Sequence, residues 1–335
     1  MKNIYIAVVL IYSLFLVSCL EVDLDDSESS QSPSSIDFST NLEAISWSKL
    51  NLNLSDSPGE FHDVKVLDGL LFGANDNGLL KVYPDSTFDL KGFVDGHSLN
   101  HELSYTNTVS SLKNEILSGS FLSWLSYSND YGETFKTFSS LDLGLPDNSL
   151  IFDVHISLSG KWLISTDEGL VYSDDKGESF FVISNLSGFS AKIIKNKIFY
   201  ASSEGLKVSS DFGITFSDFN LSSSFNVGKI YYDVNIGLVL SASYDSIDGI
   251  NTLGERVIIT DLLSESFFVS KVFKDISDIH FIKNTLFVGT SRGLFASKNY
   301  GKDFIEVFTG QVKSIDSGYD TIVISGIDGL YKSDF

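Results

Sequence analysis

Four stretches of eight residues follow one template, and they decide the fold. They read SNDYGETF at Ser128–Phe135, SDDKGESF at Ser173–Phe180, SSDFGITF at Ser209–Phe216 and SKNYGKDF at Ser297–Phe304. In each stretch, an Asp or Asn stands two residues after the serine, and a glycine stands two residues further on. A side-chain oxygen there can accept backbone N–H bonds, and glycine permits a positive φ, so the template predicts a tight hairpin turn. Its recurrence indicates a repeat architecture.

A second repeated feature, a Gly–Leu step, gives the period. Such a step precedes the template turns at Gly169, Gly205 and Gly293, and it recurs at Gly329 and, near the start, at Gly78. The spacing is 36 residues from 169 to 205 and from 293 to 329, but 91 from 78 to 169 and 88 from 205 to 293. Each of the two longer spacings is double and hides a degenerate unit, one at 123–125 and one at 256–267. The seven units are rich in Ser, Val, Ile, Phe and Tyr, which predicts an all-β chain.

The sequence of each unit predicts four short strands, and the clearest copy of the unit lies between residues 279 and 308. Its strands are Ile279–Ile282, Thr285–Gly289, Gly293–Ser297 and Phe304–Phe308, with the template turn between the third and the fourth. Seven such units predict a single β-propeller of seven four-stranded blades. The chain ends at 330–335 in a third strand, whereas 45–52 resembles a fourth strand. We therefore expect the N-terminal strand to complete the last blade, which removes the exposed sheet edges.

The template resembles the Asp-box, or BNR repeat, of sialidases, sortilin-type receptors and photosystem-assembly-factor-like propellers. In that family the boxes lie at the periphery, away from ligands, so the resemblance implies that the box residues are structural rather than catalytic. Sialidases hold the substrate carboxylate with three arginines, whereas this chain has only Arg256 and Arg292. A sialidase is therefore not expected. The box residues are Asp130, Gly132, Asp175, Gly177, Asp211, Gly213, Asn299 and Gly301.

The N-terminus predicts export and a lipid anchor. Lys2 is followed by the nearly apolar run 4–17 and then by Cys19, in a sequence that resembles the bacterial lipobox. The alternatives are an ordinary cleaved signal and a membrane-spanning helix, for which the run is short of the ~20 residues required. We expect a signal peptide at 1–18, a lipid on Cys19, an acidic Ser-rich tether at 19–40 and the propeller at 41–335. The expected location is the bacterial outer membrane or cell surface.

Charge and cysteine content exclude several classes of partner. The formal net charge of −21 repels the phosphate backbone, so no nucleic acid partner is expected. The same charge repels anionic lipid surfaces, so the expected contact with the membrane is through the lipid alone. A single cysteine permits no internal disulfide and no cysteine metal cluster. No cofactor is expected, and we expect a monomer. A metal site built from His97, His101 and Glu102 is conceivable, but a polar loop with scattered histidines is the better interpretation.

Strand order predicts which face binds a partner. The turns between the first and second and between the third and fourth strands lie on one face, and the remaining connections on the other. The long connections 93–105, 141–150 and 242–254 all belong to the second face, and long loops tend to be functional. The candidate binding residues on this face are Trp124, Tyr105, Tyr244, Asp245, Asp76, Asp167, Glu204, Arg292 and Asp328.

Repeated acids at the start of the inner strands are expected to be structural. Asp63, Asp153 and Asp278 recur there, and repetition favours a bond to a neighbouring blade over a single active site. The sequence therefore predicts a lipid-anchored, non-enzymatic propeller that binds an envelope protein or a glycan. The alternatives are a glycoside hydrolase that uses acids on the long-loop face and an assembly factor for an envelope complex.

Overall fold

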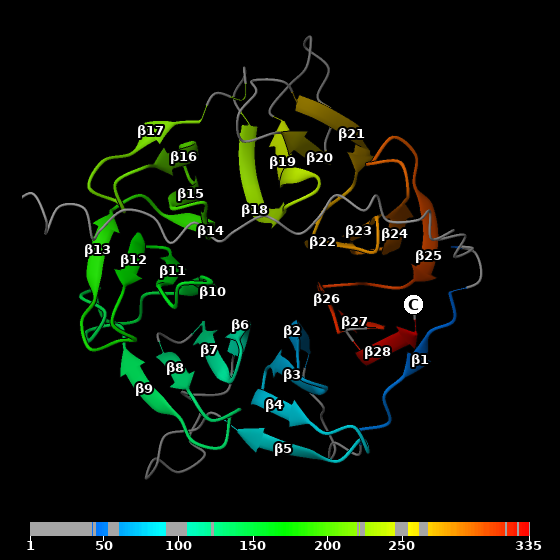
Figure 1. Ribbon diagram of the computed structural model, residues 1–335, viewed down its shortest axis with the longest axis horizontal. Coiled ribbons are helices and arrows are strands. Elements are labelled where there is room, and N and C mark those ends of the chain that lie inside the picture. Colours follow the sequence, from blue (N-terminus) through cyan, green and yellow to red (C-terminus); the bar gives the residue numbers. More distant parts are fainter. Residues whose placement is uncertain are drawn as a thin grey trace, which may run out of the picture. The chain divides into compact units, whose positions relative to one another are not determined.

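The computed structural model describes residues 42, 45–52, 60–91, 106–121, 124–219, 221, 225–244, 254–260, 267–318, 320–326 and 328–334. Cys19, the predicted tether, His97, His101, Tyr105 and Asp245 lie outside these ranges. The chain divides into two units, 1–40 and 41–335. Within the second unit, seven four-stranded antiparallel sheets form a ring, as the sequence predicts (Figure 1). No helix among the described residues is long and apolar enough to cross a membrane.

The strands of each blade are named A to D from the centre of the ring outwards, and in blades 1–6 they follow chain order. Blade 1 contains β2 (Phe61–Leu67), β3 (Leu70–Asn75), β4 (Gly78–Val82) and β5 (Phe88–Lys91). Blade 2 contains β6 (Thr106–Leu112), β7 (Glu115–Ser120), β8 (Trp124–Ser128) and β9 (Lys136–Ser139). Blade 3 contains β10 (Ile151–Ile156), β11 (Trp162–Thr166), β12 (Leu170–Ser173) and β13 (Phe181–Ser184). Blade 4 contains β14 (Gly188–Ile194), β15 (Lys197–Ser202), β16 (Gly205–Ser209) and β17 (Ser217–Asp218).

The two degenerate units of the sequence are complete blades. One is blade 2; the other is blade 5, with β18 (Phe225–Asp233), β19 (Gly237–Tyr244), β20 (Glu255–Thr260) and β21 (Phe267–Phe273). Blade 6 contains β22 (Asp278–Ile282), β23 (Thr285–Gly289), β24 (Gly293–Ser297) and β25 (Ile305–Thr309). The last of these begins one residue later than predicted. Phe304 remains in the turn, where its ring packs edge-on against Phe273 at 5.1 Å.

Blade 7 combines the two ends of the second unit. It contains β26 (Ser314–Ser317), β27 (Thr321–Gly326) and β28 (Gly329–Asp334), and β1 (Ser48–Lys49) pairs with β28 as the outermost strand. Next to this short pairing, the Leu50 amide donates to the Leu330 carbonyl at 2.9 Å. The Trp47 indole N–H donates to the Val307 carbonyl of blade 6 at 2.8 Å. How much this N-terminal segment stabilises the ring stays a prediction.

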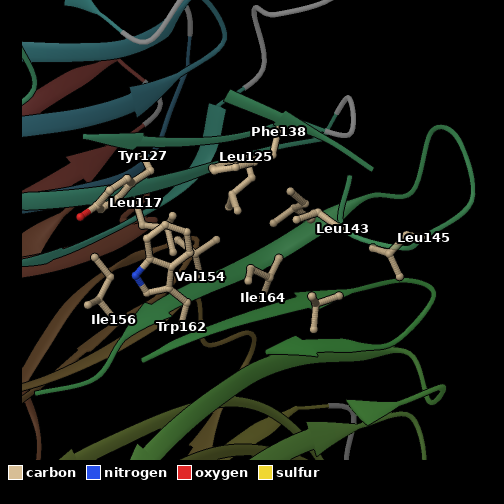
Figure 2. Packing of buried hydrophobic residues seen from close by; sticks show 12 residues of the cluster. Leu117, Leu125, Tyr127, Phe138, Leu143, Leu145, Val154, Ile156, Trp162 and Ile164 are labelled. Atoms are coloured by element: carbon tan, nitrogen blue, oxygen red, sulfur yellow. The ribbon is translucent and has the colours of Figure 1, made fainter. Parts of the chain in front are cut away.

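The hydrophobic core lies between neighbouring blades. Figure 2 shows Trp162 of β11 beside Tyr127 of β8, with ring centroids 4.5 Å apart. The same cluster includes Leu143 and Leu145, which are 0% and 4% exposed. The connection 141–150, expected to be a long surface loop, is thus held in the core by two of its leucines. It contributes less free surface than its length suggests.

The four template turns are held by hydrogen bonds internal to each hairpin. In blade 4, Ser209 donates to Asp211 at 2.7 Å, the Gly213 amide donates to Ser209 at 2.8 Å, and the Thr215 hydroxyl donates to Asp211 at 2.6 Å. The hydroxyl and amide of Thr215 lower the pKa of Asp211 to about 2. In blade 6 an asparagine takes the place of the aspartate, so the side-chain bond across the turn runs in the opposite direction. The Asn299 amide donates to the Asp303 carboxylate at 2.9 Å. These bonds give the template residues a structural explanation.

Candidate functional site

The ring has two faces, which are named after the connections that they carry. The A–B face carries the A–B and C–D turns, and the B–C face carries the B–C turns and the D–A connections between blades. Five of the predicted binding residues lie in B–C turns, between the strands that the sequence predicted. They are Asp76, Asp167, Glu204, Arg292 and Asp328. Trp124 is the half-buried first residue of β8. Tyr244 ends β19, and its side chain lies outside the described part of the chain.

Four of the predicted acids on the B–C face already have partners within the protein. Asp76 accepts from the Glu60 amide at 2.8 Å, and Asp167 accepts from the Leu150 amide at 2.7 Å. These two carboxylates fasten a B–C turn to the adjacent D–A connection. Two further ion pairs join Glu204 to Lys207 and Asp328 to Lys49, at 3.3 and 3.2 Å. By contrast, the exposed guanidinium of Arg292 has no hydrogen bond to any other described residue.

A β-bulge recurs at the start of the inner strands of blades 1–5. The register with strand B shifts by one residue in each blade. The extra residue is His62, Asn107, Phe152 and Phe189 in blades 1–4, and in blade 5 Gly228 and Lys229 together stand opposite one residue of strand B. An extra residue in one strand re-aims its side chain, which is why bulges occur beside binding sites. In blades 1–4 the same backbone device therefore presents His, Asn, Phe and Phe at one level of the ring.

The bulge residues form two aromatic contacts. Phe152 and Phe189, on neighbouring blades 3 and 4, have ring centroids 5.7 Å apart, and Phe189 is 49% exposed. His62 meets Phe121 edge-on at 6.2 Å, and Phe121 is 37% exposed. The His62 ring also joins Asp76 at 2.7 Å and Lys313 at 3.3 Å. Since a lysine can only donate, His62 Nδ1 accepts from Lys313, and Nε2–H donates to Asp76.

The residue after the bulge in blades 1–4, and its equivalent in blades 6 and 7, forms a belt that joins the blades. Ser314 donates to Asp63 at 2.5 Å and to Asp278 at 3.1 Å, and Ser190 donates to Asp153 at 2.8 Å. Backbone amides of the neighbouring blades add further bonds to Asp63 and Asp278, at 2.8 and 2.7 Å. The prediction that these aspartates bond to neighbouring blades is therefore confirmed. The belt consists of Asp63, Thr108, Asp153, Ser190, Asp278 and Ser314.

A chamber of about 650 Å³ lies within the ring and is lined by all seven inner strands. Its charged groups include Lys65, which lies 3.7 Å from Asp316, and Lys192, which lies 3.3 Å from Asp153. Burial alone would lower the pKa of Lys65, but Asp316 and the belt carboxylates raise it above its ordinary value. Burial and the neighbouring Lys192 lower the pKa of His155 to about 3, so its imidazole is neutral at pH 7.

Sequence reasoning missed both the bulge residues and the chamber. The sequence pointed to Asp63 and Asp153 but not to His62 and Phe152, the residues directly before them. A bulge only shifts the alternation of buried residues by one, so that Phe61 and Val64 lie three residues apart, and over so short a strand this is a weak signal. The other available signal was that this position varies in chemistry, whereas the next position repeats Asp or a hydroxyl.

Comparisons with known proteins establish the fold. No family model matches the sequence, and no curated protein matches it. Among solved structures, YCF48 bound to a D1 peptide is similar with a TM-score of 0.63 and 16% identity, over 87% of this chain and 97% of that one. The extracellular domain of a hybrid two-component system from B. thetaiotaomicron has a TM-score of 0.63 and 17% identity, over 83% of this chain and 40% of its own. A GH74 xyloglucanase from Xanthomonas campestris has a TM-score of 0.63 and 11% identity, over 86% of this chain and 53% of its own.

Proposed function

We propose that this propeller is a lipid-anchored binding module that holds a partner on its B–C face at the cell envelope. The observation that carries the proposal is the recurrent bulge at the start of the inner strands. One backbone geometry is kept in blades 1–4, while the side chain that it presents changes from His to Asn and Phe. A rigid frame with variable side chains is the arrangement that recognition requires.

The exposed aromatics support binding, and a protein partner is the favoured one. Phe189 presents an apolar ring on a strand and Phe121 presents one directly after a strand, and such rings are typical anchors of an interface. The similarity to YCF48 extends over almost that whole chain, and the YCF48 structure holds a peptide. A glycan is the alternative, because aromatic rings also stack on sugars.

The acids of the B–C face do not favour hydrolysis. A glycoside hydrolase needs one carboxyl group free to donate a proton and a second free to act as base or nucleophile. Asp76 and Asp167 are instead held by backbone amides. Release of reducing sugar from xyloglucan or another envelope glycan by the purified propeller would contradict the non-enzymatic assignment.

The anchor is part of the proposal and rests on the sequence. The apolar run before Cys19 supports export, and the similarity to an extracellular bacterial domain agrees with an exported location. A lipid on Cys19 would place the propeller at the membrane surface, separated from it by the acidic segment 19–40.

Photo-crosslinking from opposite faces of blade 4 tests the proposal. A crosslinking amino acid at Phe189 lies on the B–C face, and the same amino acid at Ile214 lies in the C–D turn on the A–B face, where Ile214 is 83% exposed. We expect a defined protein adduct from position 189 and none from position 214. Loss of binding to purified envelope glycan in Phe189→Ala, without a protein adduct, would favour the glycan. An adduct from position 214 alone would show that the face is assigned wrongly.

A further inference from the structure

The chamber belongs to the A–B side of the belt. Its lining continues from the belt to Lys195 and to Leu158, which lies in the A–B turn of blade 3 and is 93% exposed. His62, Phe152 and Phe189, at the opposite mouth, do not line it. The chamber is therefore a second site, distinct from the surface proposed above for the partner.

Two polar groups of the chamber lack a partner. Lys65 and Lys192 have Asp316 and Asp153, but the Lys229 ammonium has no hydrogen bond or ion pair within the described part of the chain. The Nε2 atom of His155 is also buried without a partner. Both residues line the chamber. His155 Nε2 is closed off from the cavity by neighbouring atoms, whereas the Lys229 ammonium is an unpartnered group that lines it, which indicates a ligand or water there.

Apolar side chains extend the lining to the A–B mouth, which also carries Lys195. Leu112 stands two residues after Ser110, Ile194 two residues after Lys192, and Leu158 two residues after Ile156. Two strand residues span ~6.6–6.8 Å. A ligand that enters from this mouth would place its inner end among the lysines and its outer end among leucine and isoleucine side chains.

The charges select a single negative group at the inner end. Lys229 offers a positive charge that no ion pair among the described residues uses. Asp63, Asp153 and Asp278 also line the chamber, and their charges raise the pKa of Lys229 although burial opposes this. A dianion such as phosphate would bring its second charge against these three carboxylates. A monoanion would pair with Lys229 and bring no second charge against them.

We propose that the chamber binds a carboxylate attached to an apolar group, with Lys229 as its charge partner. Two sources present this chemistry, a small apolar carboxylic acid and the C-terminal residue of a peptide. The competing explanation is that Lys229 only neutralises the belt and that the chamber holds water. The two explanations differ in whether an added carboxylate binds.

Calorimetric titration of the whole protein separates them. The probes are N-acetyl-leucine, its amide, and a short peptide ending in leucine with a free or an amidated C-terminus. We expect each free acid to bind about tenfold more tightly than its amide, because only the acid makes the charged bond. Tighter binding of the peptide than of N-acetyl-leucine would identify a peptide C-terminus as the source; equal binding would identify a small acid. Equal affinity of acid and amide, or no binding at millimolar concentrations, would overturn the proposal.

Variants test the role of Lys229. Lys229→Met should abolish the preference for the acid, and Lys229→Arg should keep it. Lys113→Met is the matched control, since Lys113 is an exposed lysine in an A–B turn and does not line the chamber. If Lys229→Met fails to fold, Leu158→Glu replaces it, because a carboxylate at the exposed mouth should weaken binding of the acid while Ile214→Glu does not. Unchanged binding in both Lys229→Met and Leu158→Glu would contradict the assignment.

Discussion

Replacing Gly177 by alanine should destabilise the propeller by more than the backbone strain alone would, because the new methyl group would also crowd the core. Gly177 lies in the template turn of blade 3 at φ +79°, where an added Cβ would stand 2.7 Å from Phe138 and 2.9 Å from Trp162. A left-handed conformation costs a non-glycine residue about 1–2 kcal/mol, and overpacking a core adds about 1–3 kcal/mol. We therefore expect Gly177→Ala to lower the free energy of unfolding by about 2–5 kcal/mol.

The same blade contains the control. Gly160 lies in the A–B turn at φ +77° and has no atom within 4 Å of an added Cβ, so Gly160→Ala should cost only the backbone part. The difference between the two variants, measured by equilibrium urea unfolding with tryptophan fluorescence, isolates the packing under the turn at about 1–3 kcal/mol. Gly301→Ala should resemble Gly160→Ala more closely, because the nearest atom there is 3.4 Å away. Equal losses for Gly177→Ala and Gly160→Ala would refute the view that the turn is packed against the core.

Three further predictions concern the anchor, the ring and the chamber. Cys19→Ala should release the protein from the membrane fraction or leave an unprocessed precursor; continued fatty-acid labelling would contradict the anchor. Deleting 20–40 should leave the melting temperature unchanged, whereas deleting 20–52 removes β1 and should lower it; equal melting temperatures would contradict ring closure. His155 has a folded-state pKa of about 3 against 6.5 when unfolded, so the unfolded chain binds the proton first and stability is lost as pH falls from 6.5 towards 3. Melting curves of His155→Gln should show a smaller loss across this range, and an identical loss would show that the ring is not buried in its neutral form.

The sequence predicted the features that repeat and missed the features that do not. The template turns and the Gly–Leu steps are local, so the blade count followed from them, even where Trp124 and Arg256 mark degenerate units. The connection 141–150 was read by its length alone. Its apolar residues Leu143 and Leu145 carried the signal for burial, and the structure places both in the core. The chamber had no local signal, because Lys65, Lys192 and Lys229 converge only when seven strands close into a ring.

An odd number of blades explains why the belt is interrupted at one place. From blade 6 through blade 4 the belt positions read Asp278, Ser314, Asp63, Thr108, Asp153 and Ser190, so a carboxylate alternates with a hydroxyl donor. Alternation of two kinds of group cannot close around seven positions, and one blade must break it. That blade is the fifth, where Lys229 stands in place of a carboxylate or a hydroxyl. The belt holds the other blades together by pairing, whereas blade 5 has a charge that the pairing does not use. Lys229 is thus left over by the geometry of the ring, and this is the physical reason to look for a ligand beside it.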